Sequence, residues 1–321
     1  MKQTRFVPYG RVFVNQGEEK GEIWSDKLRR ILLCVALIGV LFSSGYLFDN
    51  LVIVPLMNNQ GYDDLRGLVD ADTHSAEEGI WINSSFGDDM RNENGVLVAF
   101  ESLVAKFPYV KGWIEVPGTR INYPVVQPVV KDNNFFIHSG IDGKYNPNGS
   151  IFFDYRMDLS TRESALSSRN LVAYGHHMRS GAMFADLLKY DSLAFYKKTP
   201  VIRMDTIYDR GQWVVISVMK CTGVTTSSSY FDYTQVKFEN GQEFDEFIEA
   251  VKSRSIVDTP YTANENDQII TLQTCSYERK DYRTIVVARK LRRGEDKIDV
   301  SSAKAAENVV FPKGFSFKMK P

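Results

Sequence analysis

The sequence predicts a mainly β protein whose strands close, or nearly close, into a barrel that one membrane-spanning helix precedes. Three observations lead to this prediction. Eight short β-rich segments separated by turn residues follow one another between residues 112 and 289, as in small antiparallel barrels. Two helical patterns interrupt these segments, and a stretch near the N-terminus, residues 31 to 48, contains no charged residue.

The predicted strands are rich in Val, Ile, Phe and Tyr and are bounded by Gly, Pro, Asn and Asp. In chain order they are GWIEVP, INYPVV, GSIFFD, NLVAYG, PVIRMDT, QWVVISVM, QIITLQT and RTIVVAR. The interrupting helices are AMFADLLKY, after Gly181, and GQEFDEFIEAVKS. In the second helix, apolar residues recur with the helical period and predict packing against the core: Phe244, Phe247, Ile248 and Val251. A further helix is predicted in ENGVLVAFESLVAKFP, before the first strand.

The uncharged stretch ILLCVALIGVLFSSGYLF divides the chain. It is long enough to span a bilayer, and Lys27, Arg29 and Arg30 precede it, so the positive-inside rule keeps the N-terminus in the cytoplasm. A cleaved signal peptide is the nearer alternative, but the apolar run is longer than usual and a 30-residue tail precedes it. We therefore expect a single-pass membrane protein with an uncleaved anchor and an extracellular domain after it.

The expected organisation has five parts. Residues 1–30 form a cytoplasmic tail, residues 31–48 the transmembrane signal-anchor helix, and residues 49–99 an extracellular stalk with N-terminal helices. Residues 100–290 form the catalytic domain, and residues 291–321 an irregular tail over its surface.

Composition excludes several classes of function. The formal net charge is −1 and no dense run of Lys or Arg follows the first thirty residues, which argues against nucleic acid as a partner. The expected external part contains only Cys221 and Cys275, too few for a scaffold stapled by disulfides. The spacing of Cys and His lacks the short intervals typical of zinc sites, so no metal is expected. A free, reactive thiol thus becomes a candidate.

Cys275 is the stronger candidate for such a thiol. It ends the predicted strand QIITLQT, and the loop SYERKDY leads into RTIVVARK. A hairpin of this form returns Arg283 to a position opposite Thr274 and Cys275, whereas Arg289 would lie roughly 20 Å away at about 3.3 Å per residue. Arg279, in the loop, is the alternative arginine. A thiol acts as a nucleophile when a nearby base or cation favours the thiolate.

The chain offers four histidines as the base. His74 lies in the polar stalk, and His138 lies in a loop-like stretch where a solvated or structural role is the simpler interpretation. His176 and His177 follow the predicted strand NLVAYG. Because neighbouring residues of a strand point to opposite faces, only one of these two can face the thiol, and spacing alone leaves the choice open. The alternative is that Cys275 is merely a small buried residue.

The motif TLQTC, with RTIVVARK after it and YGHHM upstream, resembles the sortases, membrane-anchored cysteine transpeptidases of Gram-positive bacteria. The resemblance extends over about residues 100–290 and is to class B. The stretches that favour class B are KGWIEVPGTRINYPVVQ, DNNFF, NPNGSIFFDYR and YGHHMRSGAMFADLLKY, and the helix predicted between the strand with Cys221 and the strand with Cys275.

The resemblance implies an eight-stranded sortase β-barrel with N-terminal helices and a helix inserted between its sixth and seventh strands. It implies Cys275 as the nucleophile, His176 as general acid and base, and Arg283 as the residue that stabilises the oxyanion and the substrate. Gln273 and Ser276 stand where better-known class B members have Ser and an acidic residue. Substrate contacts are expected from the residues around the nucleophile, namely Leu272, Gln273, Thr274 and Ser276.

The implied activity is cleavage of a C-terminal sorting signal, of the NPxTN or (S/P)PxTG kind, after its Thr. The new carboxyl end is then joined to an amine of the lipid-linked cell-wall precursor, without a cofactor. Two alternatives remain at this point: a pilin polymerase that joins subunits through lysine, and a membrane-tethered binding module without catalytic activity. The tail after Leu291 is longer than is usual in the family.

Overall fold

The computed structural model describes residues 16–48, 62, 65–67, 90–276 and 278–321. The chain forms two compact units, Met1–Met57 and Asn58–Pro321, and each is considered by itself. Most of the predicted stalk, including His74, lies outside the described residues, as does the beginning of the predicted cytoplasmic tail.

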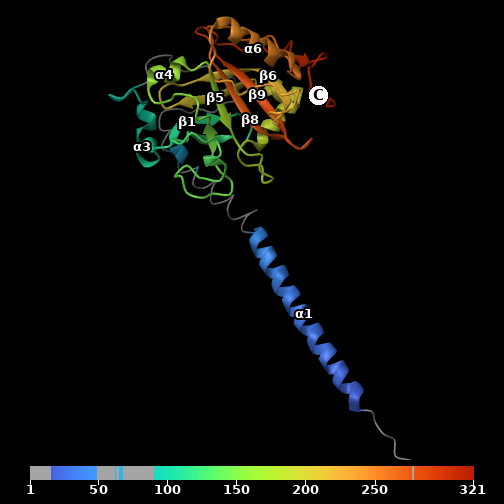
Figure 1. Cartoon of the computed structure of the whole chain (residues 1–321). Helices are drawn as coiled ribbons and strands as arrows, with labels where there is room; N and C mark the ends of the chain where they lie inside the picture. Colours follow the sequence, from blue (N-terminus) through green and yellow to red (C-terminus); the bar gives the residue numbers. More distant parts are fainter. Residues whose placement is uncertain (1–15, 49–61, 63–64, 68–89, 277) are drawn as a thin grey trace, which may run out of the picture. The chain divides into compact units, whose positions relative to one another are not determined.

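The N-terminal unit contains one long helix, α1 (Gln16–Phe48) (Figure 1). Its part from Asp26 to Phe48 has a mean hydropathy of 2.4 and is not buried within the protein. A helix that is apolar all round requires an apolar surrounding. Helix α1 is therefore a candidate membrane anchor or signal sequence, and the predicted segment 31–48 lies within it.

The C-terminal unit is a closed eight-stranded barrel with the strand order β1-β2-β3-β4-β8-β9-β6-β5 (Figure 1). The predicted barrel is therefore confirmed, and each predicted segment forms one of its strands. The strands are β1 (Val110–Glu115), β2 (Asn122–Val126), β3 (Ile151–Phe153), β4 (Asn170–Tyr174), β5 (Val201–Thr206), β6 (Gln212–Thr222), β8 (Ile269–Ser276) and β9 (Tyr282–Lys290). Two short strands, β7 (Val257–Asp258) and β10 (Lys304–Ala305), pair separately.

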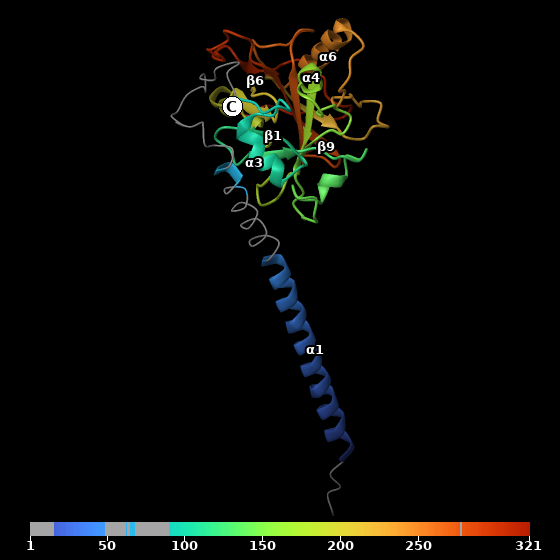
Figure 2. The same cartoon turned by 90° about the vertical axis from the view of Figure 1, so that its left-hand side faces the viewer.

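Several helices accompany the barrel. They are α3 (Val98–Lys106), η3 (Phe135–Ile137), α4 (Arg162–Ser167), η4 (Ala185–Asp191), α5 (Leu193–Lys198) and α6 (Gly241–Ser253). Helix α6 is inserted between β6 and β8 and buries its apolar stripe as predicted. In both views α6 lies at the upper edge of this unit, and α3 lies lower, beside β1 (Figure 2).

The helix predicted in AMFADLLKY is partly wrong. The structure has a 3₁₀ helix, η4, that begins only at Ala185. Met183 adopts a φ of 57°, and this left-handed backbone cannot continue into a right-handed helix. Helix α4 was not predicted from the apolar period because it is short; a capping box between Thr161 and Ser164 begins it.

Residues 291–321 follow strand β9 and are mostly irregular. Apart from β10 and an isolated bridge between Ser192 and Lys320, residues 291–321 contain no helix or strand. The tail nevertheless contacts the helices beside the barrel: Lys320 N donates to Asp191 O at the end of η4, and Leu193 N at the start of α5 donates to Lys320 O, both at 2.8 Å.

Candidate active site

The hairpin of β8 and β9 brings the predicted cysteine and arginine together. Cys275 lies directly opposite Arg283, and Thr274 lies opposite Thr284. Both strands extend further than predicted, to the pair Ser276 and Tyr282. Arg289 lies at the other end of the hairpin, opposite Ile269. Arg283, and not Arg289, is therefore the arginine of β9 that lies across from the thiol.

A second cysteine, Cys221, also lies next to Arg283 in the sheet. This position was not predicted from the sequence. On its other edge β9 pairs with β6, and Cys221 lies opposite Arg283. Residues directly opposite in antiparallel strands share a face of the sheet, so Arg283 lies between Cys221 and Cys275. The two thiols differ in their surroundings. Burial raises the pKa of Cys221 to about 12, and this residue is 4% exposed, whereas Cys275 is only half-buried.

Alternation along β8 separates the residues around the nucleophile. Gln273 and Cys275 are half-buried, whereas Leu272, Thr274 and Ser276 are buried. Of the predicted substrate contacts, only Gln273 therefore shares the accessible face with Cys275. The other three side chains belong to the opposite face, where they pack within the protein.

The histidine pair follows β4, which runs parallel to β8. The last paired residues are Tyr174 and Gln273, and Gly175 N still donates to Gln273 O at 3.1 Å. Paired residues share a face, so Tyr174 lies on the face of β8 that carries Gln273 and Cys275, and the two histidines follow just beyond the end of β4.

The two imidazoles make different contacts. His176 Nε2 lies 2.8 Å from Ile137 O, and His177 Nδ1 lies 3.1 Å from Cys275 O. A carbonyl oxygen only accepts, so each of these nitrogens donates. In the neutral ring of His176 this leaves Nδ1 as the basic nitrogen. His138, to which the sequence analysis gave no catalytic role, stacks on His176 with ring centroids 5.9 Å apart.

Arg283 lies close beside Gly223, where an added Cβ would press on the guanidinium. A Cβ at Gly223 would be 3.0 Å from Arg283 Cζ and 3.1 Å from Asp281 O, closer than ordinary side-chain contacts. Gly223 N donates to Asp281 O at 2.7 Å, and Arg283 Nη1 donates to Tyr282 O at 3.0 Å. The start of the segment between β6 and α6 thus limits the positions that the guanidinium can adopt.

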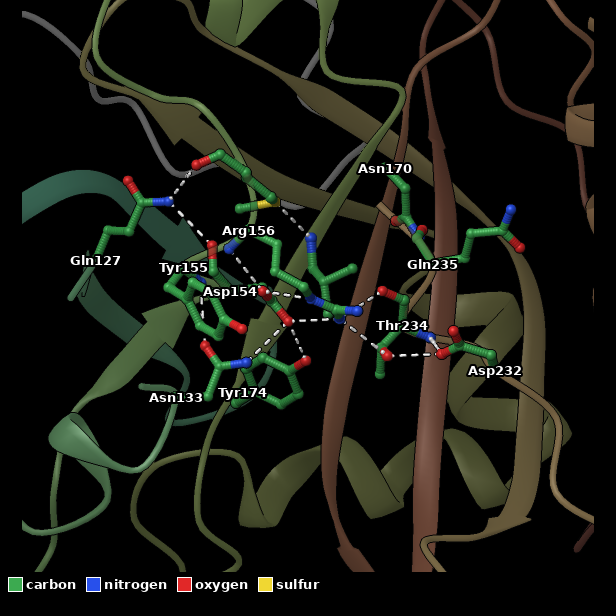
Figure 3. Close-up of polar contacts among 12 residues, drawn as sticks. Gln127, Asn133, Asp154, Tyr155, Arg156, Asn170, Tyr174, Asp232, Thr234 and Gln235 are labelled. Atoms are coloured by element: carbon green, nitrogen blue, oxygen red, sulfur yellow. Dashed lines mark hydrogen bonds and ion pairs between the residues drawn. The ribbon is translucent and has the colours of Figure 1, made fainter. Parts of the chain in front are cut away.

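A buried carboxylate supports the end of β4 (Figure 3). Asp154 is fully buried, and its oxygens accept hydrogen bonds from Arg156, from Tyr174 Oη at 2.6 Å and from Asn133 Nδ2 at 2.9 Å. Burial acts to raise the pKa of Asp154, but the hydrogen bonds from Arg156 and Tyr174 outweigh it, so this pKa is lowered. Arg156 Nη2 also donates to Thr234 O at 2.8 Å, which connects the segment between β6 and α6 to the same network.

The described part of the chain contains no group of three His, Cys, Asp or Glu side chains able to hold a metal ion. The groups gathered at this end of the hairpin are the thiol of Cys275 and the guanidinium of Arg283, with the imidazole of His177 at the backbone carbonyl of Cys275.

Comparisons with known proteins agree with this geometry. The Sortase domain family model matches residues 114–291. Sortase B of Staphylococcus aureus is 31% identical over 204 residues, which are 63% of this chain and 78% of that protein. A solved sortase B–substrate complex from Staphylococcus aureus superposes with a TM-score of 0.59 at 27% identity, over 75% of this chain and 99% of that one. Sortase B of Bacillus anthracis gives a TM-score of 0.59 at 26% identity, over 75% and 99%.

The family match covers more than half of the chain and contains every strand of the barrel except the beginning of β1. The similar proteins are sortases B, and the inserted helix α6 agrees with that class. This chain belongs to the sortase family, as a class B sortase, and is a cysteine transpeptidase.

Proposed function

We propose that Cys275 is the nucleophile of this sortase, that His176 is its general acid and base, and that Arg283 stabilises the oxyanion. The observation that supports this assignment best is the row Cys221, Arg283, Cys275, in which Cys221 is buried whereas Arg283 and Cys275 are both half-buried. Sortases act on proteins that bear a sorting signal. The substrate proposed here is a surface protein with a C-terminal signal that is cut after Thr.

In the first half-reaction the thiolate of Cys275 attacks the Thr carbonyl carbon and forms a C–S bond. The electron pair of the carbonyl moves to oxygen, and Arg283 donates to the resulting oxyanion. When the intermediate collapses, the C–N bond breaks and His176, as imidazolium, protonates the leaving amine. The product is a thioester between Cys275 and the new carboxyl end.

In the second half-reaction an amine of the cell-wall precursor attacks the thioester. The neutral imidazole of His176 takes the proton of the amine, for which Nδ1 is the free position when Nε2 donates to Ile137 O. The C–S bond then breaks and Cys275 leaves as the thiolate. No step requires a cofactor.

His177 receives a supporting role in this proposal. Its Nδ1 donates to the backbone carbonyl of Cys275, so it holds the strand end that carries the nucleophile and not the thiol itself. His176→Ala is therefore expected to abolish transfer, and His177→Ala only to reduce it. Abolition by His177→Ala together with a mild effect of His176→Ala would exchange the two roles.

Gln273 is the proposed side-chain contact for the sorting signal, since it lies on the face of Cys275. Leu272, Thr274 and Ser276 support that face from the other side of the strand. The proposed acceptor is an amine of the cell-wall precursor, and the alternative acceptor is a lysine of another pilin subunit. The shared identity of the relatives as sortases argues against a binding module without activity.

The proposed location is the cell membrane, with residues 1–30 in the cytoplasm, residues 31–48 as an uncleaved anchor, and the stalk and barrel outside. Helix α1 supports this proposal by its length and hydropathy. The full-length protein is expected to fractionate with membranes and to expose only residues after the anchor to external protease. A released mature form that begins near residue 46 would identify a cleaved signal instead.

The activity is tested with the soluble part, residues 50–321, incubated with NPxTN and (S/P)PxTG peptides and with candidate amines. Mass spectrometry is expected to find peptides cut after Thr and joined to the amine of the cell-wall precursor type. Cleavage at another residue would contradict the proposed signal, and transfer only to a pilin-type lysine would contradict the proposed acceptor.

A further inference from the structure

The C-terminal tail lies outside the matched Sortase domain, which ends at residue 291, yet it contacts the catalytic hairpin. Near its end the side chains alternate. Phe315 and Phe317 are half-buried and Met319 is 5% exposed, whereas Ser316 and Lys318 are exposed. This pattern is typical of an extended segment with one face against the protein.

The first contacts are with the turn of the hairpin. The ring of Phe315 lies 4.6 Å from the ring of Tyr282, and Phe311 lies 5.7 Å from Phe315. Tyr282 is paired with Ser276 and directly precedes Arg283. From the turn itself, Arg279 Nη1 donates to Gly314 O at 3.3 Å and its guanidinium lies 5.6 Å from the Tyr282 ring.

A buried lysine connects the tail to the same turn. Lys220 is fully buried, and its Nζ lies 4.8 Å from the centre of the Phe317 ring. The ammonium donates to Glu278 Oε1 at 2.7 Å, to Asp191 Oδ2 at 2.8 Å and to Thr284 Oγ1 at 2.9 Å. Glu278 belongs to the turn. A buried ammonium needs these partners because an unpaired charge inside a protein costs several kcal/mol.

These contacts lie on the opposite face of the sheet from the row Cys221, Arg283 and Cys275. Lys220 precedes Cys221 in β6, and it pairs with Thr284, the residue after Arg283 in β9. Because successive residues of a strand point to opposite faces, the cluster around Lys220 is on the reverse of the face that carries Arg283.

The tail also contacts the segment between β6 and α6, residues 223–240. Lys313 N donates to Ser229 Oγ at 3.1 Å. The start of that segment is joined to the hairpin turn through Gly223 N and Asp281 O, 2.7 Å apart. Residues 311–317 therefore contact both loops that border Arg283.

We propose that residues 311–317 are a brace that holds the hairpin turn and thereby positions Arg283 for the sortase reaction. Phe315 and Phe317 are then positioning residues, which act through Tyr282 and Lys220 and do not touch the substrate. This inference rests on the proposed role of Arg283. A hydrogen-bond donor aimed at an oxyanion must be held to about 0.5 Å, and loops with few buried apolar contacts open more readily than packed ones.

The test compares Phe315→Ala with Phe107→Ala in the full-length protein in detergent. Both substitutions truncate a half-buried Phe, but Phe107 lies at the end of α3. With a fluorogenic signal peptide, Phe315→Ala is expected to lower kcat at least about tenfold with little change in KM, since misplacement by about 1 Å costs up to about 10²-fold. Phe107→Ala is expected to keep kcat, and Phe315→Tyr, which retains the ring, to restore it.

A double-mutant cycle separates the brace from the proposed function. In an Arg283→Ala background, Phe315→Ala is expected to cause no further loss, because the residue on which the brace acts is gone. An inactive Arg283→Ala together with a Phe315→Ala that behaves like Phe107→Ala at equal folded fraction would overturn the brace alone. Full additivity of the two substitutions would overturn it as well. A silent Arg283→Ala would refute the role of Arg283 and, with it, the brace.

Discussion

Replacement of Arg283 by lysine keeps the positive charge and removes the planar arrangement of donors. In the structure, one of those donors, Nη1, is already engaged with Tyr282 O at 3.0 Å. Arginine has further N–H groups in fixed directions for an oxyanion, whereas the single nitrogen of lysine must serve both acceptors. Loss of one oxyanion donor costs about 10² to 10³ in kcat, or about 2.7–4 kcal/mol. We expect Arg283→Lys to lose at least about 10²-fold in kcat while KM changes little.

Arg289→Lys is the matched control, because it is the same substitution in the same strand. Arg289 lies six residues further along β9, roughly 20 Å at about 3.3 Å per residue. Its turnover is expected to be nearly normal once the protein is folded. The stability of this variant is expected to be lower, because Arg289 is 1% exposed and donates to Glu295 at 2.7 and 2.6 Å and to Thr262 O at 3.0 Å. Hydrogen bonds of this charged kind contribute about 1.5–3 kcal/mol each.

The assay is steady-state cleavage of a fluorogenic signal peptide at a temperature where circular dichroism shows both lysine variants folded. Near-normal turnover by Arg283→Lys would mean that charge alone suffices and would refute the argument from donor geometry. A normal Arg283→Ala would remove Arg283 from the mechanism.

Three further predictions use the surroundings of single residues. In a protein with Cys34 replaced by Ser, a thiol reagent at neutral pH should label Cys275 at once and Cys221 only after unfolding, because burial raises the pKa of Cys221 to about 12. Equal labelling of both cysteines in the folded protein would contradict this prediction. The pKa of Asp154 is lowered in the folded state, so its ionised carboxylate stabilises the fold above about pH 4, and this stabilisation is lost as the pH falls through the folded pKa. Urea unfolding should therefore show that Asp154→Asn lowers the free energy of unfolding more at pH 7 than at pH 3. An equal decrease at the two pH values would contradict this role of the carboxylate. Gly223→Ala should lower kcat, because its Cβ would displace the Arg283 guanidinium; unchanged turnover would show that the guanidinium has room.

The features that depend on residues close to one another in the chain could be predicted from the sequence. Strands β8 and β9 are joined by a short turn, so a count along the hairpin already pairs Cys275 with Arg283. The buried apolar face of α6 was also predictable, because its residues recur with the helical period within a single helix. In both cases the contacts are between residues close in the chain.

Features that join distant segments were not predictable in this way. The position of Cys221 opposite Arg283 depends on the pairing of β6 with β9, which are separated by α6 and β8. The network around Asp154 depends on Tyr174 and Thr234 from other parts of the barrel. The start of η4 depends on the backbone of Met183, for which no propensity gives a signal.

The tail is an intermediate case. The alternation Phe315, Phe317, Met319 is visible in the sequence and indicates an extended segment with one buried face. It does not indicate which part of the barrel the segment covers, since any apolar surface would satisfy the same pattern.

The central claim is that Cys275 carries the acyl group. The most direct measurement is acid-quenched mass spectrometry of the protein with a signal peptide and no added amine, followed by peptide mapping. The expected result is a thioester adduct on the fragment that contains Cys275, absent in Cys275→Ala and retained in Cys221→Ala. An adduct on Cys221, or transfer by a folded Cys275→Ala, would contradict the account.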